Sequence, residues 1–403
     1  MSAQMVPLGE VTRWLSGGTP NRSVSKYWQG EIPWISASTL KDSEISESDQ
    51  HLSPEGVAVG SKMAPVGSTL FLVRGSALYN EIRAGLVVKP VCFNQDVKAL
   101  IPGPNVVPKF LTYSLLGRSE DLLKLVSTAS NSTGVLDTKL VKAFGILLPP
   151  LPEQRAIAAA LSDADGLIGA LDALIAKKRA IKQAAMQQLL TGKKRLPGFE
   201  GEWETKQLCE IADVDPENLP SDTDPTYSFN YISLEQVDNG HLVGYSEEVF
   251  SAAPSRARRV LRYDDVLMST VRPNLMAHLH YRGQIKNAVC STGFSVLRVK
   301  NGLADSGFIF AHLFGSFVNK QIEKMLAGSN YPAISSRDVK SIEMTCPPTL
   351  DEQRAIAAVL SDMDAEIAAL ERRRDKAKQI KQGMMQQLLT GRIRLVEPPG
   401  AAA

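Results

Sequence analysis

Two long stretches of the chain share one pattern of hydrophobic and polar positions. In residues 151–196 apolar side chains recur at alternating steps of four and three, as in a helix that buries one stripe against a partner helix. This stripe consists of Ile157, Leu161, Ala164, Ile168, Leu171 and Ile175. In residues 350–395 the stripe consists of Ile356, Leu360, Met363, Ile367 and Leu370, then Ile380 and Met384 beyond an interruption at Arg374. The pattern predicts one long helix in each stretch and a coiled coil between them.

The two stretches are copies of each other. They align without a gap at an offset of 199, and 28 of the 46 aligned positions are identical. This period is far too long for a solenoid, whose units span roughly 20–50 residues. We infer that one large module has been duplicated, because the half-chains outside the helices also resemble each other weakly.

Proline and glycine mark the ends of both helices. Pro-Pro precedes each helix at 149–150 and 347–348, and Leu-Thr-Gly ends each at 190–192 and 389–391. A helix from Glu153 to Thr191 would be about 58 Å long. Because a globular region lies between the helices and the chain must return, we expect an antiparallel pair. We expect the stripe of one helix to pack directly on the stripe of the other.

The remaining segments have the mixed pattern of α/β modules. Apolar runs at 145–148 and 295–299 predict strands, whereas 109–126 and 308–326 predict helices. Weakly similar pairs of segments are 5–11 and 205–211, 32–36 and 229–233, 68–75 and 264–273, and 140–150 and 338–348. The predicted fold is therefore two α/β (α+β) modules joined by two long helices in an antiparallel coiled coil, with an internal pseudo-two-fold repeat. The predicted boundaries are 1–150, 151–199, 200–348 and 349–396, with a disordered tail at 397–403.

Composition restricts the class of protein without naming a partner. An apolar fraction of 44% and a charged fraction of 22% are ordinary for a globular protein, and the net charge is only +2. A nucleic-acid partner would therefore need locally clustered basic residues. The four cysteines form no CxxC pair, which indicates buried thiols in a reducing cytosol. No apolar run reaches the roughly 18 residues of a membrane span, so we expect a cytoplasmic protein without a membrane partner.

Catalytic motifs are missing from the sequence. There is no GxxxxGK[ST] loop, no GxGxxG opening a helix and no HExxH, and no Asn-Pro-Pro-aromatic motif of adenine methyltransferases. The five histidines have no metal-ligand spacing. We therefore predict no catalytic residue, no metal site and no enzyme activity in this chain.

Polar loops in the modules carry side chains suited to DNA. Glycines and Thr19 allow a phosphate close to the backbone, arginine and lysine neutralise it, and amides pair with base edges. In the first module the candidates are Gly17, Gly18, Thr19, Arg22, Lys26, Arg74, Asn80, Arg83, Asn94 and Gln95. In the second they are Arg256, Arg258, Arg259, Arg272, Asn274 and His278. A tight turn explains the glycines equally well, and a solvated surface is the usual interpretation of an arginine run.

The combined motifs resemble the specificity (S) subunits of type I restriction-modification systems over the full length. The resemblance rests on PPLPEQRAIAAALSDAD at 149–165, PPTLDEQRAIAAVLSDMD at 347–364, and the MQQLLTG ends at 186–192 and 385–391. SGGTPNRSVSKYWQGEIPWIS at 16–36 is similar to the start of many target recognition domains. The second module departs from this pattern, because its equivalent segment at 213–228 is acidic and lacks the GGTP loop.

The resemblance implies a non-catalytic subunit that binds double-stranded DNA. Each module would be a target recognition domain for one half of a bipartite target. The coiled coil would set the spacing and dock two methyltransferase subunits, which carry S-adenosylmethionine. Restriction/translocase subunits would carry ATP and Mg. The coiled-coil positions are Ile157, Leu161, Ile168, Leu171, Ile356, Leu360, Ile367 and Leu370.

Two other interpretations remain open from the sequence. The chain could be a non-catalytic coiled-coil scaffold for protein partners, since its charge is near neutral. A salt-dependent affinity for DNA would separate this scaffold from a DNA reader. The chain could also be the tail of a longer restriction-methylation enzyme, although Met1 directly precedes a module, which argues against that interpretation.

Overall fold

The chain forms two compact units, each combining one globular module with half of each long helix. The computed structural model describes residues 4–130, 133–326 and 332–396, so the predicted tail at 397–403 lies outside the described residues. One unit comprises Met1–Asp172 and Arg372–Ala403, and the other comprises Ala173–Glu371. In the described residues, no helix is long and apolar enough to cross a membrane.

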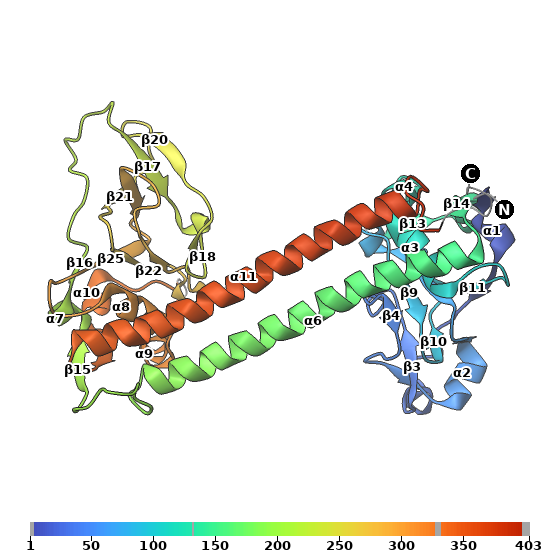
Figure 1. Ribbon diagram of the computed structural model, residues 1–403, viewed down its shortest axis with the longest axis horizontal. Coiled ribbons are helices and arrows are strands. Elements are labelled where there is room, and N and C mark those ends of the chain that lie inside the picture. The colour runs from blue at the N-terminus through green and yellow to red at the C-terminus, as the bar shows by residue number, and fades with distance from the viewer. Residues whose placement is uncertain (1–3, 131–132, 327–331, 397–403) are drawn as a thin grey trace. The chain divides into compact units, whose positions relative to one another are not determined.

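In the described part of the first module the strands form four small sheets, and Figure 1 labels several of these strands. Their strand orders are β1-β14, β5-β3-β10-β6, β2-β11-β7-β9-β4 and β12-β13-β8. β3 and β10 pair in parallel, as do β4 and β9, and the other pairs are antiparallel. The strands are β1 (Gln4–Pro7), β2 (Thr12–Ser16), β3 (Ile32–Ile35), β4 (Glu44–Ile45), β5 (His51–Leu52), β6 (Met63–Ala64), β7 (Thr69–Leu72), β8 (Arg74–Gly75), β9 (Ala84–Val87), β10 (Val91–Phe93), β11 (Val97–Pro102), β12 (Val126–Ser130), β13 (Thr133–Leu136) and β14 (Gly145–Leu148).

The second module repeats the framework of the first. Its orders β15-β26, β20-β17-β24-β21 and β16-β25-β22-β23 correspond to β1-β14, β5-β3-β10-β6 and β2-β11-β7-β9, and β18-β19 is a further hairpin. β17 and β24 pair in parallel, as β3 and β10 do. The strands are β15 (Glu204–Gln207), β16 (Ala212–Val214), β17 (Ser228–Ile232), β18 (Val237–Asp238), β19 (His241–Leu242), β20 (Ser246–Val249), β21 (Ala257–Val260), β22 (Val266–Ser269), β23 (Leu279–His280), β24 (Ala288–Ser291), β25 (Phe294–Val299) and β26 (Glu343–Cys346). The weakly similar segments fall on equivalent strands, so the predicted internal repeat is confirmed.

The cores of both modules sit on their equivalent central strands. Leu70 of β7 and Leu267 of β22 are fully buried. Cys92 of β10 and Cys290 of β24 are also fully buried, as the sequence predicts for the cysteines, whereas Cys209 is partly exposed. Burial raises the pKa of the Cys92 and Cys290 thiols, that of Cys92 to about 12.

Short helices complete the modules, and two predicted helices are each broken in two. Residues 109–126 form α3 and α4 and then enter β12, and residues 308–326 form α8 and α9. The breaks occur beside Gly117 and Gly315, where a Cβ would lie 2.4 Å from Leu389 and 3.4 Å from Leu190. Gly117 therefore lies too close to Leu389 for a side chain, whereas Gly315 makes an ordinary van der Waals contact with Leu190. The short helices are α1 (Leu8–Val11), α2 (Pro54–Gly60), α3 (Pro108–Gly117), α4 (Ser119–Leu123), α5 (Thr138–Ala143), α7 (Leu208–Ile211), α8 (Ser306–Leu313), α9 (Ser316–Leu326) and α10 (Ser336–Ser341), with 3-10 turns η1 (Ser25–Trp28), η2 (Ser76–Tyr79), η3 (Leu234–Gln236) and η4 (Pro273–Leu275).

The long helices α6 (Leu151–Leu189) and α11 (Leu350–Leu388) run antiparallel within each unit (Figure 1). In the first unit, Asp165 and Asp172 of α6 pair with Lys381 and Arg374 of α11 at 2.6 and 3.5 Å. In the second unit the ion pairs are Lys178–Glu366, Arg179–Glu371 and Lys182–Asp364. Residue numbers fall along α11 as they rise along α6, so the predicted antiparallel pairing is confirmed.

The apolar stripes are buried in part, and their buried ends meet different partners from those predicted. Ile157 and Leu161 pack with Leu388 and Leu389, at the other end of α11. The equivalent Ile356 and Leu360 pack in one cluster with Met186, Leu189 and Leu190. An antiparallel register brings the start of one helix to the end of the other, so the expected packing of Ile157 and Leu161 on Ile356 and Leu360 is wrong. Leu171 and Ile367 are buried, whereas Ile168 and Leu370 are partly exposed.

Two buried ion pairs join the helix ends, and we call Glu153–Arg394 and Glu352–Arg195 the end pairs. Glu153 is 3% exposed and Glu352 is fully buried. Arg195 donates through Nε and Nη2 to the two carboxylate oxygens of Glu352, both at 2.5 Å. Arg394 makes the same two-pronged contact with Glu153. Each end pair thus links the first turn of one long helix to the segment that follows the other long helix.

A glutamine beside each glutamate fixes the helix to its own module. Gln154 accepts a hydrogen bond from the Val107 N–H at 2.8 Å and donates to the carbonyl oxygen of Asn105 at 2.9 Å. Gln353 accepts from the Asp305 N–H at 2.9 Å. The repeated Glu-Gln sequence therefore orients each module on the helix that follows it.

Candidate nucleic-acid interface

In the first module, several candidates lie around the turn after β10. The turn contains Asn94 and Gln95, and the Gly17–Gly18 loop packs on the end of the strand. The Gly18 N–H donates to the Phe93 carbonyl oxygen at 2.9 Å. A Cβ at Gly17 would lie 2.1 Å from that oxygen, and one at Gly18 would lie 2.3 Å from another backbone oxygen. Both glycines are therefore required by close backbone packing, whether or not a phosphate approaches.

Polar groups beside this turn differ in how accessible they are. The exposed Thr19 hydroxyl donates to Gln95 Oε1 at 2.7 Å. Asn94 is 5% exposed, donates to the Asp96 carboxylate at 3.0 Å and accepts from the Asp96 N–H at 3.1 Å. Asn94 thus shapes the turn, and its predicted base contact is corrected because the amide is buried and occupied. Arg74 is exposed, and its guanidinium makes no hydrogen bond, ion pair or ring contact with any described residue.

Arg22 and Lys26 have partners within the module. The Arg22 guanidinium stacks 4.4 Å from the Trp28 ring centroid and donates to Gln50 at 3.2 Å. Lys26 pairs with Glu55 at 2.7 Å on the surface, and this hydrogen bond raises the pKa of Lys26. Exposed pairs of this kind exchange readily with other partners, so both cations stay candidates.

Asn80 and Arg83 lie in the connection between β7 and β9. Asn80 is exposed. Arg83 is half-buried, donating through Nε to Glu81 at 2.7 Å and through Nη1 to the Ala37 carbonyl oxygen at 2.8 Å. The guanidinium of Arg83 thus holds two segments of the module together, and its expected base contact stays a prediction.

In the second module, the acidic segment binds part of the arginine run. Asp215 and Arg259 pair at 2.5 Å, with side chains 10% and 12% exposed. Glu217 pairs with Arg262 at 2.7 Å and Arg298 at 3.1 Å, and hydrogen bonds from these two arginines lower the pKa of Glu217. The expectation that Arg259 contacts DNA is corrected, because its charge is used inside the module.

Arg256 and Arg258 precede that buried pair. Arg258 donates to the Ala257 carbonyl oxygen at 2.8 Å and stacks 4.8 Å from the Phe250 ring. Arg256 is exposed with no partner in the part of the chain that the structure describes. Its carbonyl oxygen accepts from the Thr292 N–H at 2.8 Å, which puts Arg256 beside the turn after β24.

Arg272, Asn274 and His278 occupy the connection between β22 and β23. Arg272 and Asn274 are exposed, and neither side chain makes a hydrogen bond, ion pair or ring contact with a described residue. His278 is fully buried, and burial lowers its pKa to about 4. The expected DNA contact of His278 is therefore corrected, because the ring is neutral and belongs to the core.

Several of the remaining exposed candidates lie around equivalent turns in the two modules. The Asp96 carbonyl oxygen accepts from the Val73 N–H at 2.9 Å, and the Gly293 carbonyl oxygen accepts from the Thr270 N–H at 2.8 Å. In the first module this bond joins the turn after β10 to the segment that follows β7. In the second module it joins the turn after β24 to the segment that follows β22. We call this surface the turn edge. It carries Thr19, Arg74 and Gln95 in the first module, and Arg256, Arg272 and Asn274 in the second.

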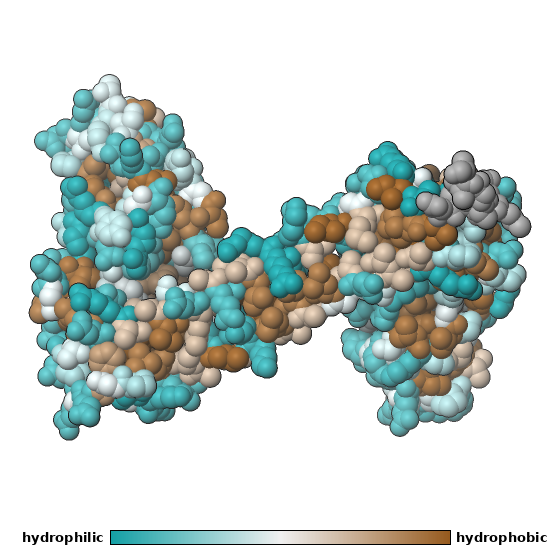
Figure 2. Space-filling view, in the orientation of Figure 1, coloured by the Kyte–Doolittle hydropathy of each residue, from teal (hydrophilic) through white to brown (hydrophobic). Residues whose placement is uncertain are grey.

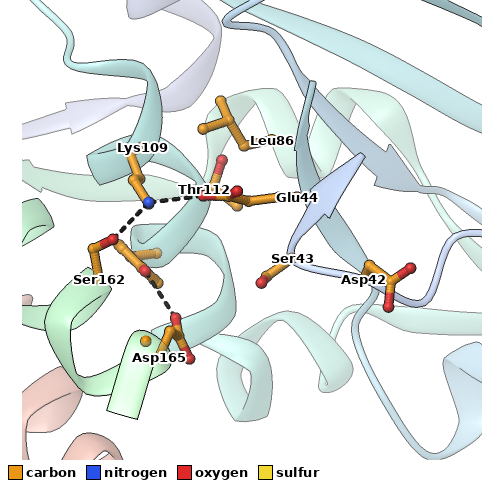
Figure 3. Close-up of a pocket in the computed structure, with 10 residues that line it drawn as sticks. Asp42, Ser43, Glu44, Leu86, Lys109, Thr112, Ser162 and Asp165 are labelled. Carbon is orange, nitrogen blue, oxygen red and sulfur yellow. Dashed lines mark hydrogen bonds and ion pairs between the residues drawn. The ribbon is translucent and has the colours of Figure 1, made fainter. Parts of the chain in front are cut away.

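A polar recess of about 470 Å³ lies between α3 and α6 in the first unit (Figure 3). Lys109 donates to Glu44 at 2.8 Å and to Ser162 at 2.6 Å. The Tyr113 hydroxyl donates to Asp165 at 2.8 Å, and burial raises the pKa of Tyr113. Sequence reasoning missed this cluster. Its one signal in the sequence was an aspartate and a lysine that are identical in both repeats, and these residues form the ion pairs Asp165–Lys381 and Asp364–Lys182. Across the described ranges, no three His, Cys, Asp or Glu side chains come together as a metal site.

Residues 2–178 and 200–381 each match the family described as the type I restriction modification DNA specificity domain. The chain belongs to this family. Two matches in one chain agree with the internal repeat seen in sequence and structure. The resemblance stated from the sequence motifs is confirmed.

Specificity subunits of two organisms are similar to this chain. It is 30% identical over 178 residues to the EcoR124I/EcoR124II specificity subunit of Escherichia coli, a match covering 44% of each protein. It is 25% identical over 418 residues to the MjaVIII specificity subunit of Methanocaldococcus jannaschii, covering 97% of this chain and 93% of that one. The chain thus spans under half of the first relative and nearly all of the second.

Solved structures share the fold of this specificity-family member. The type I restriction-modification S subunit from M. genitalium matches with a TM-score of 0.63 over 96% of each chain, at 16% identity. A chain solved for complex assembly and conformational transition of the type I R-M system matches with a TM-score of 0.58, over 97% of this chain and 98% of that one, at 20% identity. These likenesses support the two-module fold with long helices.

Both long helices of this specificity-family member also present identical exposed residues. These positions are exposed, among them Ile380, which the sequence pattern places in the second stripe, so intramolecular packing does not explain their identity. Ile181 and the equivalent Ile380 are 44% and 52% exposed, and Figure 2 shows apolar patches on the visible surface of the helices. The other exposed identical pairs include Arg155 and Arg354, Ala159 and Ala358, Asp163 and Asp362, and Lys177 and Lys376.

Proposed function

We propose that this chain is the DNA specificity subunit of a type I restriction-modification complex, and that each unit reads one half of a bipartite target in double-stranded DNA. The observation that carries this proposal is one framework built twice with different exposed residues on its turn edge. Arg74 and Gln95 project there in the first module, and Arg256 and Arg272 in the second. Arginine and glutamine can pair with base edges, and arginine also binds phosphate. Different residues on one framework are what two different half-sites require.

The coiled coil sets the distance between the half-sites. Each long helix has 39 residues, which corresponds to about 58 Å. Half-sites read from one side of DNA lie about 34 Å apart per helical turn. The buried end pairs keep both helices in one register, which a fixed spacer needs.

The exposed identical residues of the helices dock two copies of one partner. Each unit carries the same set, taken from the start of one helix and the end of the other. Two methyltransferase subunits fit this duplication, and they would supply S-adenosylmethionine. Restriction/translocase subunits would supply ATP and Mg chemistry. This chain then acts without catalysis, in the cytoplasm.

Exchange of one module tests the proposal. Residues 4–143 are replaced by the equivalent module of another family member, and the variant is assembled with its methyltransferase subunits. Mapping of methylated DNA should reveal one changed half-site and one unchanged half-site. The reciprocal exchange of 204–341 is the matched control and should change only the other half. A change in both halves, or in neither, contradicts modular reading.

Salt dependence separates DNA reading from a protein scaffold. Phosphate contacts release counterions, so the logarithm of the affinity should fall linearly with the logarithm of salt concentration. Alanine at both Arg74 and Arg256 should reduce this slope by about two. A complex that binds DNA without a salt-dependent slope would contradict the proposed function.

A further inference from the structure

The connection between β22 and β23 has an unusual backbone. Arg272 and Met276 have φ values of 50° and 51°, in the left-handed region, although both carry side chains. They flank η4, a 3-10 turn of Pro273–Leu275. Side chains rarely adopt this conformation, because Cβ comes too close to the following carbonyl oxygen. Such backbone persists only where neighbouring groups enforce it.

Hydrogen bonds from two sides enforce this backbone. The Arg272 N–H donates to the Pro332 carbonyl oxygen at 2.7 Å, and Val271 forms a bridge with Ala333. Within the turn, the Met276 N–H donates to the Pro273 carbonyl oxygen at 2.9 Å. The loop is therefore held in one shape.

His278 holds the base of the loop. The β22–β23 ladder pairs Leu267 with Leu279 and then stops. Beyond it, the Ser269 N–H donates to Nδ1 of His278 at 3.1 Å. The imidazole replaces a backbone carbonyl at the point where the chain leaves the sheet. Only a neutral ring can accept this bond, and burial keeps the ring neutral by lowering the pKa of His278 to about 4.

The buried ring leaves one of its own polar atoms unsatisfied. With Nδ1 accepting, the proton of the neutral ring lies on Nε2, and Nε2 is buried without a hydrogen-bond partner. The ring packs against Phe314 in an edge-to-face contact, with centroids 5.3 Å apart. An unpaired buried donor is unfavourable, so its presence is consistent with a loop shaped for a purpose other than stability.

The loop presents three exposed side chains of different chemistry. Arg272 and Asn274 have no partner among the described residues, and Leu275 is 61% exposed. Arginine and asparagine form two-pronged pairs with guanine and adenine, and an apolar tip contacts the thymine methyl group. The equivalent connection in the first module differs, because Arg83 there is tied to the Ala37 carbonyl oxygen.

We propose that residues 271–277 are the specificity-determining loop of the second module, that Arg272 and Asn274 bind base edges in a DNA groove, and that His278 is the positioning residue of this loop. The inference rests on the proposed function, in which the second module reads one half-site.

The test uses the assembled complex of this chain with its methyltransferase subunits. Methylation rates are measured on DNA duplexes that carry every single-base change in each half-site. Arg272→Ala should reduce discrimination about 5- to 150-fold at one or two positions of the second half-site, because a two-pronged pair contributes about 1–3 kcal/mol. Discrimination at the first half-site should not change. Arg337→Ala, an exposed arginine of α10 in the same module, is the matched control and should change neither.

Two substitutions of His278 separate positioning from bulk stability. His278→Asn keeps an acceptor near the Ser269 N–H and should retain discrimination, whereas His278→Leu should lose it at the same positions as Arg272→Ala. Uniform weakening on all duplexes by Arg272→Ala would identify a phosphate contact and overturn the inference. Unchanged discrimination in both Arg272→Ala and Asn274→Ala would also overturn it. A wild-type complex that discriminates in neither half-site would instead contradict the proposed function.

Discussion

Removal of Arg195 is the sharpest test of how the long helices are held. Glu352 is fully buried, and Arg195 is its ion-pair partner. Arg195→Leu would leave a carboxylate in the core without its two charge-assisted hydrogen bonds. The substitution would also remove bonds from Arg195 to the carbonyl oxygens of Gly201 and Glu200, at 2.6 and 3.1 Å. We therefore expect a large loss of stability in the second unit.

The magnitude follows from how far water can reach the pair. Breaking a buried ion pair costs about 3–5 kcal/mol, mostly because one charge stays buried alone. The Arg195 side chain is 24% exposed, so some water reaches the vacated space, and we expect about 3 kcal/mol. The double variant Arg195→Leu with Glu352→Leu removes both charges. It should recover about 2 kcal/mol of that loss.

Urea unfolding followed by circular dichroism measures the change, and hydrogen exchange over 186–196 and 350–360 localises it. Arg354→Leu is the matched control, since its ion pair with Asp351 is mostly exposed and should contribute under about 0.5 kcal/mol. If Arg195→Leu unfolds at the same urea concentration as Arg354→Leu, the end pair does not hold the helices. A double variant no more stable than Arg195→Leu would show that an unpaired charge is not the cause.

Three further changes test the packing, the titration and the spacing. Leu161→Ala, at a fully buried position, should cost about 2–5 kcal/mol in urea unfolding, whereas Leu167→Ala, 45% exposed, should cost under about 0.5 kcal/mol. Burial lowers the pKa of His278 to about 4 and of His312 to about 3, so the unfolded chain binds protons first as the pH falls below about 6.5. The free energy of unfolding should be at its full value above that pH and should fall by about 2 kcal/mol per histidine at pH 5. Urea unfolding at each pH measures this loss, and it should be smaller in a His278→Asn variant, which has one buried histidine fewer. Insertion of seven residues into both helices, after Asp172 and after Glu371, preserves the heptad register of the coiled coil. The spacer between the two methylated half-sites should then lengthen by about three base pairs. An unchanged spacer would contradict the proposal that the coiled coil sets this distance.

The long helices could be predicted from sequence because their pattern is local and strong. Apolar periodicity, Pro-Pro before the helix and Leu-Thr-Gly after it act within a few residues of each end. The partner of each stripe could not be predicted, because periodicity identifies the buried face and not the register between helices. The break at Gly117 was missed for a similar reason, since this glycine lies against Leu389, which is distant in sequence.

The turn edge was only partly predictable. Residue type suggested Arg74 and Arg272 correctly as exposed cations, but it could not distinguish them from Arg259, whose partner Asp215 is distant in sequence. His278 was misassigned because an alternating pattern cannot reveal which face of a short strand is buried. The end pairs did leave a signal, namely a Glu-Gln and a later arginine identical in both copies. Charged side chains are rarely buried unless they are paired, so a glutamate and an arginine repeated at both helix ends could have been predicted to form an ion pair.

The end pairs also explain why the two helical repeats stayed alike while the modules diverged. Each end joins the glutamate of one copy to the arginine of the other, so Glu153 needs Arg394 and Glu352 needs Arg195. A change in either copy would break a contact made by the other copy, and this holds at both ends. The turn edges have no such reciprocal constraint, because their contacts lie within single modules. One duplicated framework can therefore keep a common coiled coil and still carry two different sets of exposed polar residues.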